Sequence, residues 1–66
     1  MFLLFCGMNF YPGGGVHDLV GEYDMHARAF DALQEQSIFN DWAHIYNTET
    51  GKTWKYARQG KEWEEI

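Results

Sequence analysis

Apolar side chains occupy both alternating sets of positions over residues 2–8. The two sets are Phe2, Leu4 and Cys6, and Leu3 and Phe5. A strand that is apolar on both sides is typical of one covered on two faces, so we predict a strand in the interior of a sheet. A shorter strand is predicted over residues 19–23, where Gly21 indicates a bulge or a close backbone approach.

A helix is predicted over residues 25–36, which contain mostly good helix formers and neither Gly nor Pro. Asp24 precedes this run and is the expected N-cap, because its carboxylate can accept from amides of the first turn. Helical spacing predicts one stripe that packs on the sheet, made of His26, Ala29, Phe30 and Leu33. Residues 37–41 are expected to connect the helix to the next strand.

Two further strands are predicted over residues 42–47 and 53–57, which are rich in aromatic and β-favouring residues. The length of the loop between them decides which side chains share a face, since a one-residue slip exchanges the faces. We predict a three-residue loop at residues 49–51, with Gly51 in the left-handed conformation.

This register has a consequence for the aromatic side chains. It pairs Tyr46 with Trp54 and His44 with Tyr56, and the helix should pack on the face that carries them. That face then gathers Trp42, His44, Tyr46, Trp54 and Tyr56. A four-residue loop would instead place Ile45 opposite Trp54 and divide the aromatic residues between the two faces.

The elements together predict a small α+β fold, about ββαββ, with one helix packed on one face of an antiparallel sheet. Residues 1–66 are expected to form a single domain. Residues 58–66 carry many charges and are expected to form a C-terminal tail, frayed or docked on a neighbour, with Trp63 and Ile66 as candidate anchors.

Chain length limits how stable this fold can be. A chain of 66 residues buries only about 60% of the surface that its unfolded form exposes. Cys6 is the single cysteine, so no intramolecular disulfide can form, and it is expected to be a small buried hydrophobe in a reducing compartment. Homo-oligomerisation is the expected additional support, because 18% of the residues are aromatic.

Charge and hydropathy restrict the location and the partners. The N-terminal apolar run has no basic residues before it and no cleavage site, and no apolar stretch approaches the roughly 20 residues of a membrane span. We therefore expect a cytoplasmic protein. The formal net charge is −5, which disfavours nucleic-acid binding because few basic groups are present to neutralise phosphates.

Residues 10–21 hold four of the seven glycines and the only proline. Such a segment is compatible with a structural turn in which Asp18 accepts from glycine amides, a partner contact, or a small anion site. The predicted contact surface comprises Tyr11, Gly13, Gly14, Gly15, His17 and Asp18, with Trp42 or Trp54 nearby. His17 and Asp18 belong to no recognisable catalytic motif, and no metal-ligand spacing is present, so we expect no catalytic residue, metal or cofactor.

The chain resembles a family of very short proteins of tailed bacteriophages and their hosts. The family pattern is an apolar strand, a Tyr-Tyr-Pro-x-Gly-Gly block with a spaced Asp and Gly-x-Phe, an acidic helix, and an Asp-Trp-x-x-Ile strand. The matching residues are Phe10, Tyr11, Pro12, Gly14, Gly15, Asp18, Gly21 and Tyr23, then Asp41, Trp42, Ile45, Thr50 and Gly51. The resemblance covers residues 2–57 and implies a phage or prophage source and a role in blocking or diverting a host system.

Two functions follow as hypotheses. In the first, the protein is a non-enzymatic phage accessory factor that inhibits a host defence protein by direct stoichiometric binding. In the second, it is an oligomer that sequesters a nucleotide-like signalling ligand, with the glycine amides holding phosphate and an aromatic side chain stacking on the base.

Overall fold

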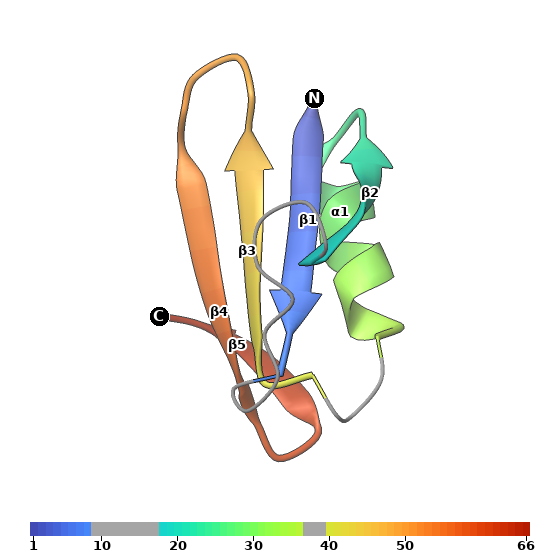
Figure 1. The fold of residues 1–66 in the computed structure, drawn as a ribbon, viewed down its shortest axis with the longest axis vertical. Helices are drawn as coiled ribbons and strands as arrows, with labels where there is room; N and C mark the ends of the chain where they lie inside the picture. Colours follow the sequence, from blue (N-terminus) through green and yellow to red (C-terminus); the bar gives the residue numbers. More distant parts are fainter. Residues whose placement is uncertain (9–17, 37–39) are drawn as a thin grey trace.

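A computed structural model describes residues 1–8, 18–36 and 40–66. One antiparallel sheet contains five strands in the spatial order β2-β1-β3-β4-β5 (Figure 1). The strands are β1 (Phe2–Gly7), β2 (Leu19–Tyr23), β3 (Trp42–Asn47), β4 (Thr53–Gln59) and β5 (Glu62–Glu65). The helix α1 (His26–Gln34) packs on one face, behind β1 and β2 in Figure 1. The predicted α+β fold class is therefore confirmed.

The N-terminal strand lies in the interior of the sheet, as its two apolar faces predicted. β1 pairs with β2 on one side and with β3 on the other. On the β2 side, Leu4 pairs with Gly21 and Phe5 with Leu19, so that Val20 is the extra residue of a bulge. A Cβ on Gly21 would lie 3.0 Å from the Tyr23 hydroxyl. The predicted bulge is present, next to Gly21 at Val20, whereas the group close to Gly21 is the Tyr23 side chain and not a backbone.

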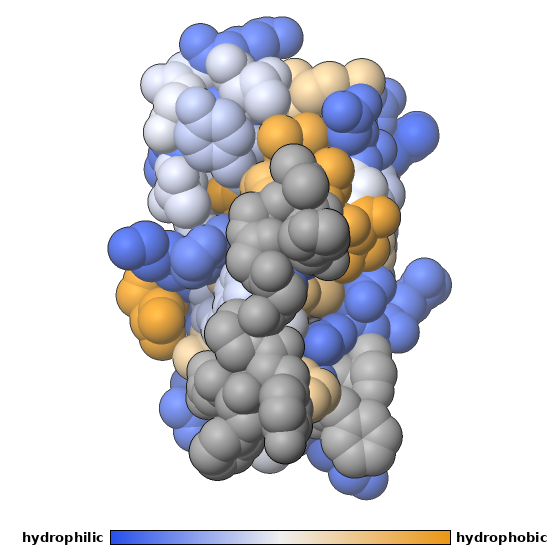
Figure 2. Space-filling view, in the orientation of Figure 1, coloured by the Kyte–Doolittle hydropathy of each residue, from blue (hydrophilic) through white to orange (hydrophobic). Residues whose placement is uncertain are grey.

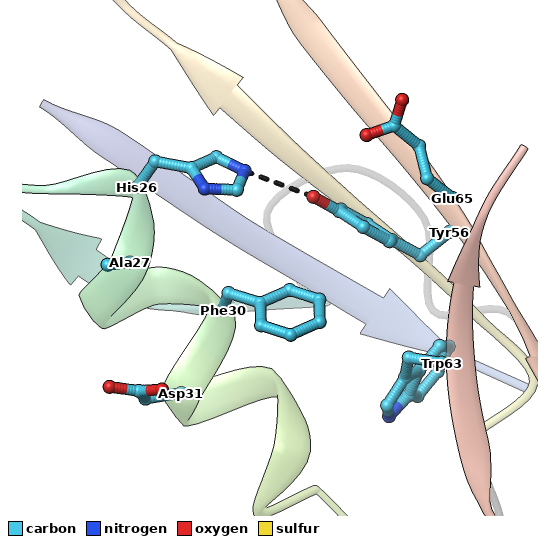
Figure 3. A pocket seen from close by; sticks show the side chains of 7 residues that line it. All are labelled: His26, Ala27, Phe30, Asp31, Tyr56, Trp63 and Glu65. Carbon is cyan, nitrogen blue, oxygen red and sulfur yellow. Dashed lines mark hydrogen bonds between the residues drawn. The ribbon is translucent and has the colours of Figure 1, made fainter.

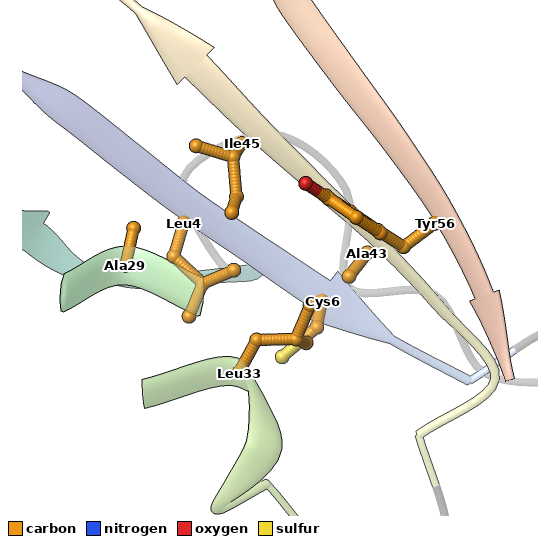
Figure 4. Packing of buried hydrophobic residues seen from close by; sticks show 7 residues of the cluster. All are labelled: Leu4, Cys6, Ala29, Leu33, Ala43, Ile45 and Tyr56. Atoms are coloured by element: carbon orange, nitrogen blue, oxygen red, sulfur yellow. The ribbon is translucent and has the colours of Figure 1, made fainter. Parts of the chain in front are cut away.

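The core lies between α1 and the central strands (Figure 4). Ala29 and Leu33 of the helix are fully buried, and His26 and Phe30 are half-buried beside them, as the helical stripe predicted. Buried residues of the cluster are Leu4, Cys6, Ala29, Leu33, Ala43, Ile45 and Tyr56. Small and branched side chains therefore fill the space directly beneath the helix.

The predicted N-cap at Asp24 is wrong. The N-cap residue is Met25, which has an extended backbone and no side-chain cap, and its carbonyl accepts from the amides of Arg28 and Ala29. The helix starts one residue too late for the Asp24 carboxylate to cap it. Asp24 forms instead an ion pair of 3.5 Å with Arg28, and both side chains are exposed.

The predicted register of the β3–β4 hairpin is also wrong, by one residue. Ile45 pairs with Trp54, and the Asn47 amide donates to the Lys52 carbonyl at 2.9 Å, leaving the four-residue loop 48–51. Gly51 has φ of +77°, so its predicted left-handed conformation is correct. Trp54 and Tyr56 consequently face α1, whereas the remaining aromatic residues of the hairpin lie on the opposite face, namely Trp42, His44 and Tyr46.

Side chains of the loop explain the longer connection. The Asn47 carboxamide oxygen accepts from the Glu49 amide at 2.9 Å, and the Thr50 hydroxyl accepts from the Lys52 amide at 3.2 Å. Such local bonds satisfy backbone donors within the turn. The register they support places Ala43 and Ile45, both fully buried, beneath the helix.

The C-terminal segment forms a fifth strand where a tail was expected. β5 pairs with β4 through a tight turn in which Gly60 has φ of +65°. Trp63 packs against the core cluster, with the Arg58 guanidinium 4.4 Å from its ring centre. The other candidate anchor, Ile66, is 76% exposed.

The surface shown in Figure 2 has apolar side chains gathered over β1 and β2, next to hydrophilic ones. On β2, Leu19 and Val20 are exposed. The helix among the described residues is too short and too polar to cross a membrane.

Candidate functional site

The structure describes only part of the contact surface predicted from the sequence. Tyr11, Gly13, Gly14, Gly15 and His17 lie outside the described residues. Asp18 and Trp42 both approach Gly7, since a Cβ built there would lie 3.4 Å from Asp18 Oδ1 and 2.9 Å from the Trp42 ring. Trp54 lies on the helix-covered face, so the sheet separates it from Trp42.

Asp18 also influences the cysteine at the end of β1. Burial raises the pKa of the Cys6 thiol, and the Asp18 carboxylate raises it further, while Arg58 acts in the opposite sense. The sulfur lies 3.7 Å from Gln36 Oε1 and 3.6 Å from Asn40 Nδ2. A protonated, buried thiol is a poor nucleophile, so Cys6 is a packing residue, as expected from the sequence.

A concave surface lies between the helix and the last hairpin. We call it the α1–β5 groove; it has a volume of about 480 Å³. Its walls come from α1 on one side and from β4 and β5 on the other (Figure 3). The lining residues are His26, Ala27, Phe30, Asp31, Tyr56, Trp63 and Glu65.

Aromatic rings form the floor of the groove. The Phe30 ring centre lies 5.4 Å from that of Tyr56, and the two rings point toward one another from opposite walls in Figure 3. His26 Nε2 and the Tyr56 hydroxyl share a hydrogen bond of 3.0 Å. The imidazole also packs 4.5 Å from the Trp54 ring centre. These contacts fix the orientation of Tyr56 and leave the floor preorganised.

Local geometry explains why these side chains meet. His26 and Phe30 are four residues apart on α1, and so are Ala27 and Asp31, so each pair shares a helix face. In the sheet, Tyr56 pairs with Glu65 and Arg58 with Trp63, which puts these four side chains on the helix side. The helix packs mainly on β1, β2 and β3, and His26 and Phe30 extend its contacts to β4.

The groove carries negative charge at its margins. Asp31 stands on the helix wall and Glu65 on the β5 wall, and none of the described lining residues is Lys or Arg. Burial raises the pKa of Tyr56, and the Glu65 carboxylate raises it further. Tyr56 therefore stays neutral at physiological pH, with its hydroxyl bonded to His26.

The indole of Trp63 has an unusual environment. Among the described residues, its Nε1 is the buried side-chain polar atom that lacks a hydrogen-bond partner. Leaving a buried donor unpaired costs about 1–3 kcal/mol. A second hollow of about 260 Å³ adjoins the same side chain and is lined by Gln34, Lys61, Glu62 and Trp63.

The lining of the groove is suited to binding. Within the described ranges, no group of three or more His, Cys, Asp or Glu residues could hold a metal ion. Aromatic faces with nearby carboxylates attract apolar groups and cations. Sequence reasoning missed this site because it assigned Trp63 to a tail, although a Trp between glutamates was itself a signal of an alternating strand.

The fold and the groove define the chain as a small α+β domain with an aromatic, acid-edged cleft. A family model described as Bacteriophage T4 protein Y07C matches residues 2–57. The chain belongs to this phage protein family. The matched range ends before β5, so one wall of the groove lies outside it. No curated protein and no solved structure matches the chain significantly.

Proposed function

We propose that the protein is a non-enzymatic phage accessory factor that binds a host protein stoichiometrically through the α1–β5 groove and thereby inhibits it. The observation that carries the proposal is the aromatic floor of the groove, where Phe30 and Trp63 are half-buried beside the buried Tyr56. Apolar aromatic surface in a preformed cleft is typical of the anchor points of protein interfaces.

The charge of the groove indicates the kind of host surface it would bind. Asp31 and Glu65 edge an apolar floor, and the whole chain has a formal net charge of −5. Complementary charge speeds association and discriminates against wrong partners. A basic host surface with an apolar centre fits both features.

The proposal is tested with a variant that fills the groove. Ala27 is exposed on the helix wall, so Ala27→Arg places a long cationic side chain in the cleft without disturbing the core. Met25→Arg is the matched control, because the Met25 side chain is 53% exposed, makes no cap hydrogen bond and does not line the groove.

The host partner is purified on the tagged wild-type protein and titrated calorimetrically with all three proteins. We expect a 1:1 complex that Ala27→Arg weakens about tenfold or more, equivalent to about 1.4 kcal/mol. Met25→Arg should bind like the wild type. Equal affinities for the two variants would contradict the groove as the binding surface. Thermal stabilisation by nucleotides, in the absence of any protein partner, would favour the ligand-sequestering function instead.

A further inference from the structure

The outer edge of β5 is the starting point for a more specific inference, which rests on the proposed function. β5 pairs with β4 and ends the strand order of the sheet. The Ile66 amide donates to the Lys55 carbonyl at 2.9 Å. Hydrogen-bonded pairs alternate in an antiparallel ladder, so Glu64 and Glu62 also turn their backbone groups toward β4. The N–H and C=O groups of Trp63 and Glu65 consequently point to the outer edge of β5, which no other described strand pairs with.

The same two residues turn their side chains into the α1–β5 groove. A strand added at this edge would bond to the backbone of Trp63 and Glu65 and place alternate side chains on the sheet face that carries the side chains of these two residues. Edge pairing supplies affinity through main-chain bonds, and pockets for alternate side chains supply specificity. A single extended segment could therefore bond to the outward backbone groups of β5 and also contact its side chains.

The glutamates of β5 indicate which kind of strand could pair with this edge. Three of the four residues of β5 are glutamates, with Glu62 and Glu64 on one face and Glu65 on the other. A second copy of the chain paired through β5 would set glutamates against glutamates, and like charges directly opposite are destabilising. A strand with basic residues opposite these positions is complementary.

We propose that β5 and the α1–β5 groove capture an extended basic segment of the partner protein as a sixth strand. Its residue opposite Trp63 is apolar and packs beside the Trp63 indole. Its residues opposite the three glutamates are Lys or Arg. The opposite edge of the sheet is unsuited to the same role, because the bulge at Val20 interrupts the regular ladder of β2.

The test uses the capped peptide acetyl-Val-Arg-Lys-Ile-Arg-Thr-amide, written for antiparallel pairing with Ile opposite Trp63. Its central residues oppose Glu65, Glu64, Trp63 and Glu62 in that order. Binding to the full ¹⁵N-labelled chain is followed by NMR at the backbone amides of Trp63 and Glu65. We expect saturable shifts at both amides, and no binding of the analogue with Glu in place of Arg and Lys.

Two N-methylated peptides separate strand addition from simple charge attraction. Methylating the Ile amide removes a donor directed at β5, whereas methylating the Lys amide modifies one directed away from it. Loss of one hydrogen bond weakens binding by about twofold to tenfold. The Ile derivative should therefore bind correspondingly more weakly, and the Lys derivative should bind like the parent. Equal binding of the two derivatives would overturn the proposal.

Protein variants provide the reciprocal test. Glu65→Pro removes the outward amide donor of an edge residue, a position where sheets tolerate proline, and should weaken the peptide more than Glu65→Gln does. Glu65→Gln should weaken it by up to about fivefold, as for an exposed charge pair. Glu22→Gln, which removes an exposed carboxylate of the other edge strand, is the matched control and should leave binding unchanged.

The peptide-binding test and the Ala27→Arg test can fail separately, so each proposal is judged by its own result. If Ala27→Arg disrupts a host complex while the basic peptide does not bind, the groove binds a folded surface and strand capture is wrong. If the peptide binds as described but no host complex forms, strand capture stands and the proposed inhibition is wrong. Dimerisation of the chain that Glu65→Pro abolishes would assign the edge to a second copy and overturn the choice of a basic partner.

Discussion

Gly7→Ala offers a sharp test of how β1 and β3 fit together. Gly7 pairs with Trp42, and the indole lies across the place where a side chain at Gly7 would be. A Cβ at this position would lie 2.9 Å from Trp42 Cζ2 and 3.2 Å from Cε2. The ring or the strand must therefore move to accommodate one methyl group.

Two opposing effects set the change in the free energy of unfolding that Gly7→Ala causes. Inserting a methyl group into a well-packed site costs about 1–3 kcal/mol. Replacing glycine where its backbone is ordinary restores about 0.4–1 kcal/mol, because the unfolded chain has fewer conformations to lose. Gly7 has no positive φ, so this gain applies. The net expectation is a loss of roughly 0.5–2 kcal/mol in the free energy of unfolding.

A double-mutant cycle isolates the clash. Urea unfolding, followed by far-ultraviolet circular dichroism, is measured for Gly7→Ala, Trp42→Leu and the double variant. In the Trp42→Leu background, Gly7→Ala should become neutral or stabilising, which gives a coupling energy of about 1–3 kcal/mol. An equal cost of Gly7→Ala in both backgrounds would refute the contact and the register it depends on.

Gly21→Ala is the comparison for this cycle. Its Cβ would lie 3.0 Å from the Tyr23 hydroxyl, the far end of a side chain that can swing aside. We therefore expect a smaller loss than at Gly7. A larger loss at Gly21 than at Gly7 would mean that the Tyr23 ring is held as firmly as the indole.

Two further predictions concern charge and stacking. Burial and the neighbouring Lys55 lower the pKa of His44 below its usual 6.5, so the contribution of His44 to stability is present above pH 6.5 and is lost as pH falls through the lowered value. The stability advantage of the wild type over His44→Gln should therefore shrink on acidification, in unfolding titrations between pH 7.5 and about 5; an unchanged difference would contradict the direction of the shift. Arg58→Lys should cost about 1–2 kcal/mol in thermal or urea unfolding, because the ammonium cannot reproduce both the stacking on Trp63 and the bond from Nε to the Asn40 carbonyl. A loss below a few tenths of a kcal/mol would show that these contacts contribute little.

Much of the fold could be read from local patterns. The double apolar alternation of residues 2–8 placed β1 inside the sheet, and the spacing of Ala29 and Leu33 identified the buried face of α1. Gly51 was correctly assigned a left-handed backbone. These features depend on side chains close in sequence, so periodicity and backbone sterics suffice to predict them.

The hairpin register could not be predicted in this way. Both loop lengths end on Gly51 in the same conformation, and both alternating sets of β3 contain side chains able to pack. The choice depends on which set fits beneath α1, and Ala43 and Ile45 leave the helix the space that Trp42, His44 and Tyr46 would occupy. That competition exists only once the helix lies on the sheet.

The groove depends even more on tertiary structure. The sequence by itself determined the class of fold, the stripe of α1 and the acidic character of the chain. Only the folded chain brought Phe30, Tyr56 and Trp63 together, because they come from a helix, an inner strand and the last strand. The charged C-terminal segment forms β5 because it pairs with β4 and Trp63 packs against Arg58. Local patterns show which faces are apolar, and the packing of distant elements decides which of those faces stays open.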